Sequence, residues 1–542
     1  MMPSSHKGAT PDTTRAHLLA RARAERTWDL AVIGGGATGV GLALDAAARG
    51  FSVLLLESED FAAGTSSRAT KLVHGGVRYL AQGNVALVSE ALHERATLLA
   101  NAPHLAQRLA FVMPGYRWWE RGFYGIGLKM YDTLAGSRGL GATEFLSSAE
   151  TRALLPTVRR RGLSGGVKYW DGQFDDARLA VTLARTAVAQ GAVVLNHCPV
   201  TALVREGGKV TGLVARDTES GARLTIAARC VVNATGVWVD DVRNMDRDEG
   251  SAAKAAIVAP SQGVHLVVDR AFMPGTHALL IPKTEDGRVL FAVPWMGKTI
   301  LGTTDTPRDD IVREPAPFAE DVEFILREAG RYLEKAPTRA DVRSVWVGLR
   351  PLVKPGGDDG DNTKQLSREH TVLVGRSGMV TVTGGKWTTY RAMAEDVLER
   401  CFASRLLPRK AKGVTAKLPL LGAAKLAAVS MTQPPGEHLY GSEAALLHEL
   451  PGAEHWLWRD AESGQGALSE AMVRFAVRHE MARSVEDVLA RRSRLLFLDA
   501  AEAARQAGAV AAILADELGP DFDAAASQRS FEALAAQYQR LP

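Results

Sequence analysis

Cysteine is scarce in this chain of 542 residues. Its three copies, Cys198, Cys230 and Cys401, lie far apart and form no C-x-x-C pair. This scarcity argues against a disulfide framework, a zinc site and an iron–sulfur cluster, so we expect no metal in the functional site. It also fits a reducing compartment.

An excess of charge of one sign is missing as well. The 65 basic residues nearly balance the 61 acidic ones, and the formal net charge is +4. No protein-wide field therefore points to nucleic acid, whereas small anions can still be ligands. The composition, with 46% hydrophobic and 23% charged residues, is that of a globular protein, and the length predicts two or three domains.

Long apolar runs are also absent. Residues 30–44 carry no charge, but they are rich in glycine and have a better explanation than a transmembrane helix. The first 27 residues hold five basic side chains and no apolar core of secretory-signal length, so we interpret them as a frayed, partly helical extension. Any membrane contact is therefore expected to be peripheral.

The glycine-rich stretch has the form of a dinucleotide-binding unit. In WDLAVIGGGATGVGLALDAAARGFSVLLLES, an apolar strand runs into Gly34, Gly36 and Gly39 with G-x-G-x-x-G spacing. A helix follows, and a second strand ends at Glu57. This pattern lets a pyrophosphate approach the backbone at a helix N-terminus, while the carboxylate of Glu57 can accept both ribose hydroxyls.

Two later segments indicate that the dinucleotide is a flavin. No second fingerprint occurs, so one dinucleotide has to do the redox work. CVVNATGVW is a buried strand that ends in a small-residue turn at Ala234, Thr235 and Gly236. GMVTVTGGKWTTYR turns at Gly384 and Gly385 before a helix, whose N-terminus would favour a ring that gains charge on reduction. Plain α/β architecture is the alternative interpretation.

The stretch GTSSRATKLVHGGVRYL, from Gly64 to Leu80, combines hydroxyl groups, glycines and cationic side chains. Freed backbone amides and the hydroxyls of Thr65, Ser66 and Ser67 could donate to phosphate oxygens or to a polar ring edge. A solvated basic loop is the alternative, since charge-rich loops usually lie in water.

Several strings together carry a resemblance to one family. They are VIGGGATGVGLALDAAARG, GTSSRATKLVHGGVRYL, VNATGVW, VPWMGKTILGTTD, VGLRPL, SREH and GGKWTTYR. In this order they resemble the FAD-dependent glycerol-3-phosphate dehydrogenases. These aerobic flavoenzymes oxidise sn-glycerol 3-phosphate to dihydroxyacetone phosphate by hydride transfer from C2 to FAD. The match covers about residues 28 to 400.

The resemblance implies an α/β protein with a glutathione-reductase-like FAD-binding fold, an interleaved antiparallel-sheet substrate domain and a C-terminal helical domain. In this division, residues 1–27 are an N-terminal extension, residues 28–400 are the oxidoreductase and residues 401–542 are the helical cap domain. The FAD segments are about 28–100, 160–240 and 345–400, and the substrate-domain segments are about 100–160 and 240–345. GVHLVVD, HALLIP, VLFAVPW and TILGTTD alternate like strands of one antiparallel sheet.

The cap domain contains the segment LSEAMVRFAVRHEMARSVEDVLARRSRLLFLD. Its apolar residues lie near helical spacing, and six arginines and four acids precede Leu495. We interpret these charges as a solvated helix face.

The resemblance also assigns roles to single residues around the substrate. Arg350 in GLRPL and Arg368 in SREH match substrate-contacting arginines, whose planar guanidinium groups suit phosphate oxygens. Arg78 and Tyr79 fall on positions that help to enclose the substrate, and the first half of their loop would meet the cofactor. Lys71 and His74 fit either ligand, or a purely structural role.

The proton acceptor stays open between two residues. His265 in QGVHLVVD matches a family active-site histidine, and its neutral imidazole could accept the hydroxyl proton near physiological pH. A lone strand histidine is more often structural. Lys386 matches a family lysine near flavin and substrate, where a cation could polarise the hydroxyl or stabilise reduced flavin.

Four interpretations of the activity compete. The first passes electrons from glycerol 3-phosphate to ubiquinone or another membrane quinone, and the second is a glycerol-3-phosphate oxidase that uses oxygen. The third is an FAD-dependent oxidase of a 2-hydroxy acid or an amine, against which the pair of arginines favours a phosphate. The fourth is a flavin-binding assembly or sensor protein.

The segment RWWERGFYGIGLKMY has the composition of an interfacial patch. It mixes aromatic with basic residues, namely Trp118, Trp119, Phe123, Tyr124 and Tyr131 with Arg117, Arg121 and Lys129. We therefore expect a cytoplasmic protein that associates peripherally with the cytoplasmic membrane, although burial of these aromatics is the alternative. A homodimer is a further expectation.

Overall fold

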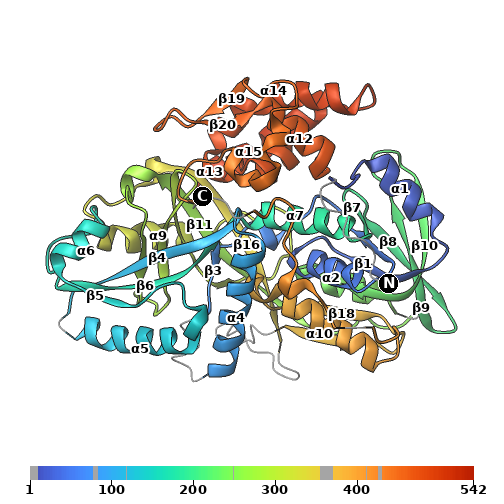
Figure 1. Ribbon diagram of the computed structural model, residues 1–542, viewed down its shortest axis with the longest axis horizontal. Coiled ribbons are helices and arrows are strands. Elements are labelled where there is room, and N and C mark those ends of the chain that lie inside the picture. Colours follow the sequence, from blue (N-terminus) through green and yellow to red (C-terminus); the bar gives the residue numbers. More distant parts are fainter. Residues whose placement is uncertain are drawn as a thin grey trace.

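The computed structural model describes residues 10–76, 84–117, 119–247, 250–354, 370–410, 412–424 and 430–542. Within these residues the chain forms two large sheets side by side, and the C-terminal domain, which holds a small two-stranded sheet, lies across their junction (Figure 1).

The first sheet has eight strands, and its centre is parallel. The central strands are almost wholly apolar, because helices such as α2 (Ala37–Ala48) cover them. Leu30 lies opposite Cys230, so the predicted return of the CVVNATGVW strand beside the first strand is confirmed. In spatial order the strands are β17 (Thr371–Val374), β18 (Val380–Thr383), β10 (Arg223–Asn233), β1 (Trp28–Ile33), β2 (Val53–Leu56) and β7 (Val193–Leu195), with β8 (Val200–Glu206) and β9 (Lys209–Arg216) joined to β10.

The second sheet has ten strands. The four strands predicted from GVHLVVD to TILGTTD are present and pair in antiparallel fashion. The sheet as a whole is mixed, since β12 also pairs with β4 in parallel. Its strands are β15 (Thr306–Pro307), β11 (Val258–Asp269), β14 (Lys298–Gly302), β13 (Leu290–Trp295), β12 (Ala278–Ile281), β4 (Ala106–Gly115), β6 (Gly165–Phe174) and β3 (Leu72–Val73) in order, with β16 (Val342–Val353) on β11 and β5 (Glu144–Leu146) on β6.

Helices surround both sheets. α7 and α10 pack against α2 on the first sheet, and α9 packs on strands of the second. The helices of this part of the chain, besides α2, are α1 (Arg15–Ala24), α4 (Val85–Asn101), α5 (Glu120–Ala135), α6 (Ser148–Leu154), α7 (Asp176–Ala189), α8 (Val239–Met245), α9 (Ala319–Tyr332) and α10 (Tyr390–Ala403). Among the described residues, no helix is both long and apolar enough to cross a membrane.

The N-terminal segment differs from the frayed extension that the sequence suggested. α1 packs on the first sheet, and both Leu18 and Ala22 are 1% exposed. Arg15 at the start of this helix donates to the carbonyl oxygen of Asn196 and forms an ion pair with Asp217. The apolar side of α1 and this buried ion pair explain why the helix is docked rather than frayed.

The C-terminal domain is mainly helical, with one small hairpin. Its elements are α11 (Ala444–Leu447), β19 (Trp456–Arg459), β20 (Gly466–Ser469), α12 (Glu470–Glu480), the π-helix η10 (Asp487–Arg492), α13 (Leu495–Leu498), α14 (Ala500–Leu518) and α15 (Ala524–Gln539). The expectation of a solvated charged face is wrong for Arg491, Arg492 and Arg494, which are at most 3% exposed. These arginines are buried because carboxylates of the other domain meet them.

Candidate functional site

The turn after β1 is built around close backbone approaches. Gly34 has a φ of 109°, in the region that favours glycine. A Cβ on Gly39 would collide with the carbonyl oxygen of Gly34, so this helix position needs glycine to pack on the turn. α2 begins directly afterwards, and the N–H of Ala37 in its first turn points at the Oγ of Ser66, 2.9 Å away. The turn therefore offers the N-terminal end of a helix to an anion.

Glu57 closes one side of this turn. Its Oε2 accepts from the backbone N–H of Gly35 at 2.6 Å, and its Oε1 accepts from the N–H of Glu59 at 2.9 Å. These two bonds hold the carboxylate at the carboxyl end of β2. A carboxylate beside a glycine turn and a helix N-terminus fits the ribose and pyrophosphate of a dinucleotide.

The turns after β10 and β18 reach the same sheet edge. Ala234, Thr235 and Gly236 follow β10, and Gly34 leaves room for the carbonyl group of Ala234. The Oγ1 of Thr383, at the end of β18, donates to the carbonyl oxygen of Gly236 at 3.1 Å. Carboxyl ends of neighbouring parallel strands are where α/β sheets bind ligands.

The loop at Thr65, Ser66 and Ser67 ties these turns together. Ser66 accepts from Ala37 through its Oγ, and its carbonyl oxygen accepts from the Nε1 of Trp387 at 2.8 Å. Thr65 donates through Oγ1 to the carbonyl oxygen of Leu349 on the second sheet. The structure thus gathers the described residues of the predicted cofactor set at one edge, Gly385 included, which directly precedes the loop of Lys386 and Trp387.

Two predicted substrate-site residues stand on one face of the second sheet. His265 and Gly263 are two residues apart on β11, and Gly263 pairs with Gly348 of β16. A Cβ on Gly263 would collide with the guanidinium of Arg350, so that group covers this face. A Cβ on Gly348 would lie 2.7 Å from the carbonyl oxygen of Arg68. The basic loop therefore closes over the sheet face that carries both predicted residues.

Arg350 is anchored by neighbouring backbone. Its Nη1 donates to the carbonyl oxygen of Gln262 at 3.1 Å, and its Nη2 donates to that of Thr304 at 2.9 Å. The carboxylate of Asp305 lies 3.4 Å from Nη1. The side chain is 24% exposed, and these contacts fix the direction of its guanidinium group.

His265 is buried beneath the basic loop. Its Nε2 lies 2.9 Å from the Oγ1 of Thr70, and its ring stacks on Trp346 with 5.2 Å between centroids. Burial, together with the charges of Lys71 and Arg350, holds the pKa of His265 well below its ordinary value. The imidazole is therefore neutral at physiological pH.

Lys71 has a more definite place than the sequence suggested. It is fully buried, and its Nζ donates to the carboxylate of Asp176 at 2.7 Å and to the carbonyl oxygen of Ser67 at 2.6 Å. Burial lowers the pKa of Lys71 to about 7, against the opposing charge of Asp176. The interpretation of this segment as a solvated basic loop is therefore wrong for Lys71.

Sequence reasoning missed the partners of Lys71. The Asp-Asp pair that directly follows the strand ending at Phe174 is a signal that could have pointed to Asp176. Nothing in the local sequence separates Arg494, which also contacts Asp176, from the arginines near it.

Other predicted residues are placed less fully. Arg78, Tyr79 and Arg368 lie outside the described residues, as does Trp118 of the predicted interfacial patch. Lys386 is half-buried at the start of a short 3-10 helix that leads into α10.

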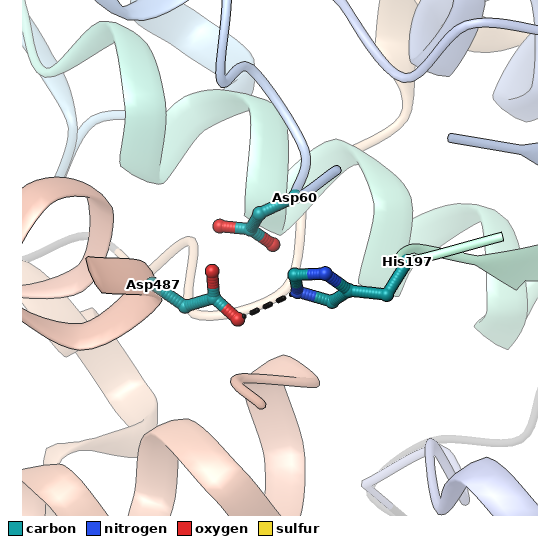
Figure 2. A group of neighbouring side chains, drawn as sticks. All are labelled: Asp60, His197 and Asp487. Atoms are coloured by element: carbon teal, nitrogen blue, oxygen red, sulfur yellow. Dashed lines mark hydrogen bonds and ion pairs between the residues drawn. The ribbon is translucent and has the colours of Figure 1, made fainter. Parts of the chain in front are cut away.

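A cluster of acidic residues and histidine lies where the C-terminal domain docks. Figure 2 shows His197 and Asp487 pointing towards each other, with Asp60 beside them. The Nε2 of His197 is 2.9 Å from Asp487, and Asp60 accepts hydrogen bonds from the guanidinium groups of Arg491 and Arg492. Because guanidinium groups already balance these carboxylates, we assign the cluster to domain docking rather than to metal binding.

Comparison with known proteins gives a consistent result. The FAD dependent oxidoreductase family matches residues 29–391, and the C-terminal domain of alpha-glycerophosphate oxidase matches residues 413–525. A mitochondrial glycerol-3-phosphate dehydrogenase of Arabidopsis thaliana is 40% identical, over 92% of this chain and 84% of its own. The human mitochondrial glycerol-3-phosphate dehydrogenase is 38% identical, over 94% of this chain and 73% of its own.

A solved structure is similar over nearly the whole chain. It is the glycerol-3-phosphate dehydrogenase from Bacillus halodurans complexed with FAD, with a TM-score of 0.75 and 29% identity. The similarity covers 98% of this chain and 99% of that one.

Proposed function

Since this chain belongs to the family of FAD-dependent glycerol-3-phosphate dehydrogenases, it is a flavoenzyme that oxidises sn-glycerol 3-phosphate, and we propose which of its residues bind and react. The predicted recognition, cofactor and activity are confirmed at this level. The observation that supports the residue assignment is the single loop that contacts both the glycine turn and the sheet face of His265 and Arg350.

The glycine turn and its neighbours hold FAD in this proposal. Gly34, Gly36 and Gly39 admit the pyrophosphate to the N-terminus of α2, and Glu57 accepts from the ribose hydroxyls. The hydroxyls of Thr65, Ser66 and Ser67 and the turns at Ala234–Gly236 and Gly385 line the rest. When bound, FAD supplies the acceptor for the hydride that leaves C2 of the substrate.

Arg350 binds the substrate phosphate. Its planar fork can make paired, charge-assisted bonds to two phosphate oxygens, and its backbone contacts fix the fork before substrate arrives. Arg368, Arg78 and Tyr79 complete this site by their resemblance to family positions. They stay predictions, as they lie outside the described residues.

His265 takes the hydroxyl proton in this proposal. An imidazole kept neutral by burial and by two neighbouring cations can accept a proton when C2 is oxidised. Lys386 then acts as the cation that polarises the hydroxyl. His265→Asn should therefore lower kcat while the FAD content stays near that of the parent. Lys386→Met should lower kcat and also raise KM.

A membrane quinone is the proposed electron acceptor. Support comes from α5, whose outward face carries the large apolar side chains Phe123, Ile126 and Met130 at 56% exposure or more. A basic and apolar helix face of this kind suits the surface of a membrane, where a quinone dissolves. The protein would then associate peripherally with the cytoplasmic membrane. The homodimer stays a prediction.

Anaerobic spectroscopy tests the assignment. Glycerol 3-phosphate should bleach the visible absorbance of the bound flavin without any other acceptor, whereas glycerol and 2-hydroxy acids should not. A soluble quinone should then restore the absorbance much faster than dissolved oxygen does. Failure to bleach would contradict the assignment of glycerol 3-phosphate as the substrate. Rapid peroxide formation in air would indicate that oxygen, rather than a quinone, is the electron acceptor.

A further inference from the structure

One arginine of the C-terminal domain reaches into the loop assigned to the cofactor. Arg494 lies between η10 and α13 and is 0% exposed. Its Nη2 donates to the carbonyl oxygen of Ser67 at 2.9 Å and to Asp176 at 3.0 Å. Its Nε lies 3.4 Å from the carboxylate of Asp175.

The carbonyl oxygen of Ser67 therefore accepts from two basic side chains. Lys71 donates to it at 2.6 Å, and Arg494 donates from the other domain. The same Asp176 carboxylate accepts from both of them and from the backbone N–H of Ala69 at 3.2 Å. Two residues distant in sequence, Asp176 and Arg494, thus hold this short loop segment together with its own Lys71.

The surroundings leave Arg494 little freedom. Its guanidinium carbon lies 4.2 Å from the ring centroid of Phe497 and 5.5 Å from that of Trp295. Arginine stays charged in proteins, so its removal would take away one of the cations that balance the buried carboxylates of Asp175 and Asp176. The contact to Ser67 is the part of this network that bears on the cofactor.

Ser67 is joined to Ser66, whose Oγ meets the first turn of α2 and whose carbonyl oxygen meets Trp387. We propose that Arg494 is a positioning residue for FAD: from the C-terminal domain it fixes Ser67, and thereby sets Ser66 against the helix end that receives the pyrophosphate. This inference rests on the proposed assignment of the Thr65–Ser67 loop to the cofactor. It makes the C-terminal domain a part of the cofactor site.

The test compares Arg494→Met with a matched variant at the same domain boundary. Glu480 is 1% exposed and pairs with Arg178 of the other domain at 2.8 Å, so Glu480→Gln also breaks a buried ion pair there. Glu480 accepts from the guanidinium groups of Arg178 and Arg492, and neither of these residues lies in the Thr65–Lys71 loop. FAD binding to the apoprotein is measured by quenching of flavin fluorescence, and amide hydrogen exchange is followed for residues 64–71.

Arg494→Met should weaken FAD binding by about tenfold or more, the usual effect of losing a hydrogen bond to a charged group. Its Ser67 and Arg68 amides, which bond to Gly64 and Thr65, should exchange faster in the apoprotein. Glu480→Gln should lower the melting temperature while changing FAD affinity less than about twofold. Arg494→Lys, which keeps the charge, should restore part of the affinity.

Two results would overturn the inference. One is parent-like FAD affinity in Arg494→Met, and the other is an equal loss of affinity in Glu480→Gln, which would indicate general destabilisation. Ser66→Ala distinguishes a failure of the loop assignment from a failure of the role of Arg494. If Ser66→Ala weakens FAD binding while Arg494→Met does not, the loop assignment stands and only the role of Arg494 fails. If neither variant changes affinity, the loop assignment fails as well.

Discussion

At the scale of single residues, a substitution at Gly36 tests the cofactor site most directly. It caps α2, and a Cβ added there would meet only the Oγ of Ser66, at 3.0 Å. Gly36→Val should therefore fold yet lose FAD, because the branched side chain fills the space assigned to the pyrophosphate. The flavin-to-protein absorbance ratio measures this. Gly122→Val on exposed α5, where nothing lies within 4 Å, should keep its flavin; full flavin in Gly36→Val would contradict the site.

Arg350→Lys tests the phosphate contact. Lysine keeps the charge but has one ammonium in place of the fork that bonds to Gln262 and Thr304. The loss of kcat/KM on glycerol 3-phosphate should correspond to about 2 to 4 kcal/mol of transition-state stabilisation. The flavin content should stay normal. Steady-state kcat/KM measures the loss.

Two controls make this test specific. Glycerol lacks the phosphate, so its very low rate should change little in Arg350→Lys. Arg343→Lys alters the same strand at a 45% exposed ion pair with Asp269 and should leave both rates near those of the parent. An equal loss on both substrates would place Arg350 at the flavin or the hydroxyl instead.

Residues whose role follows from local pattern could be predicted from the sequence, and residues defined by distant partners could not. The spacing of Gly34, Gly36 and Gly39 reports a backbone requirement that is local to one turn. The place of Lys71 depends on Asp176 and Arg494, which are 105 and about 420 positions away, so no window of sequence contains the cause of its burial.

At the scale of elements, η10 docks the C-terminal domain through buried charge. His197 follows β7, and Asp487 begins η10. Burial lowers the pKa of His197, but the Asp487 carboxylate outweighs burial and raises that pKa above its ordinary value of 6.5. The Asp487 pKa is held well below its ordinary value, burial being outweighed by His197 and by the arginines of η10.

The sign of the resulting pH effect follows from linkage. A histidine whose folded pKa is raised contributes stability below its unfolded pKa and loses it as pH rises through the folded value. The parent should therefore exceed His197→Gln in unfolding free energy by about 1 to 2 kcal/mol at acidic pH, and the gap should close above the raised pKa. Urea unfolding across this window measures the gap. His455→Gln, at a 68% exposed pair with Glu470, should show almost none; a gap for His197→Gln that grew with pH would contradict the assignment.

The strands were easier to predict than the docked helices. Alternation in GVHLVVD and the strands after it is a local signal, and the predicted FAD-binding fold with an interleaved sheet is confirmed. The sequence predicts a frayed extension where α1 lies and a solvated face for the charges around η10, because charged side chains usually lie in water. Both are docked, since Asp217 meets Arg15 and Asp60 meets Arg491 and Arg492 across the fold.

At the scale of the whole molecule, the C-terminal domain and α5 lie far apart, at the top and the bottom of the view in Figure 1. The domain boundary carries the buried ion pairs, whereas α5 presents an apolar stripe to solvent. Phe123, Ile126 and Met130 follow helical spacing and are 67%, 64% and 56% exposed. Tyr131, which the sequence placed in the same patch, is 1% exposed and bonds to Asp171 instead.

This stripe predicts how the molecule meets a membrane. Arg117, Arg121 and Lys129 are exposed on or beside α5, so anionic headgroups and apolar side chains would be engaged together. The parent should float with vesicles of phosphatidylcholine and phosphatidylglycerol, and high salt should weaken flotation. A Phe123→Ser, Ile126→Ser, Met130→Ser triple variant should remain in the soluble fraction with normal flavin content, because it loses three apolar side chains at about 2 kcal/mol each.

The control for flotation removes three exposed apolar side chains elsewhere on the surface. Ile311, Val312 and Val414 are 37%, 40% and 55% exposed and lie outside α5, so their triple replacement by serine should leave flotation unchanged. Quinone reduction should follow the membrane contact: the α5 variant should lose turnover with a quinone embedded in vesicles and keep it with a soluble quinone analogue. If the parent protein stays wholly soluble in the presence of anionic vesicles, the interfacial role of α5 is contradicted. A membrane-embedded electron acceptor then loses its structural support.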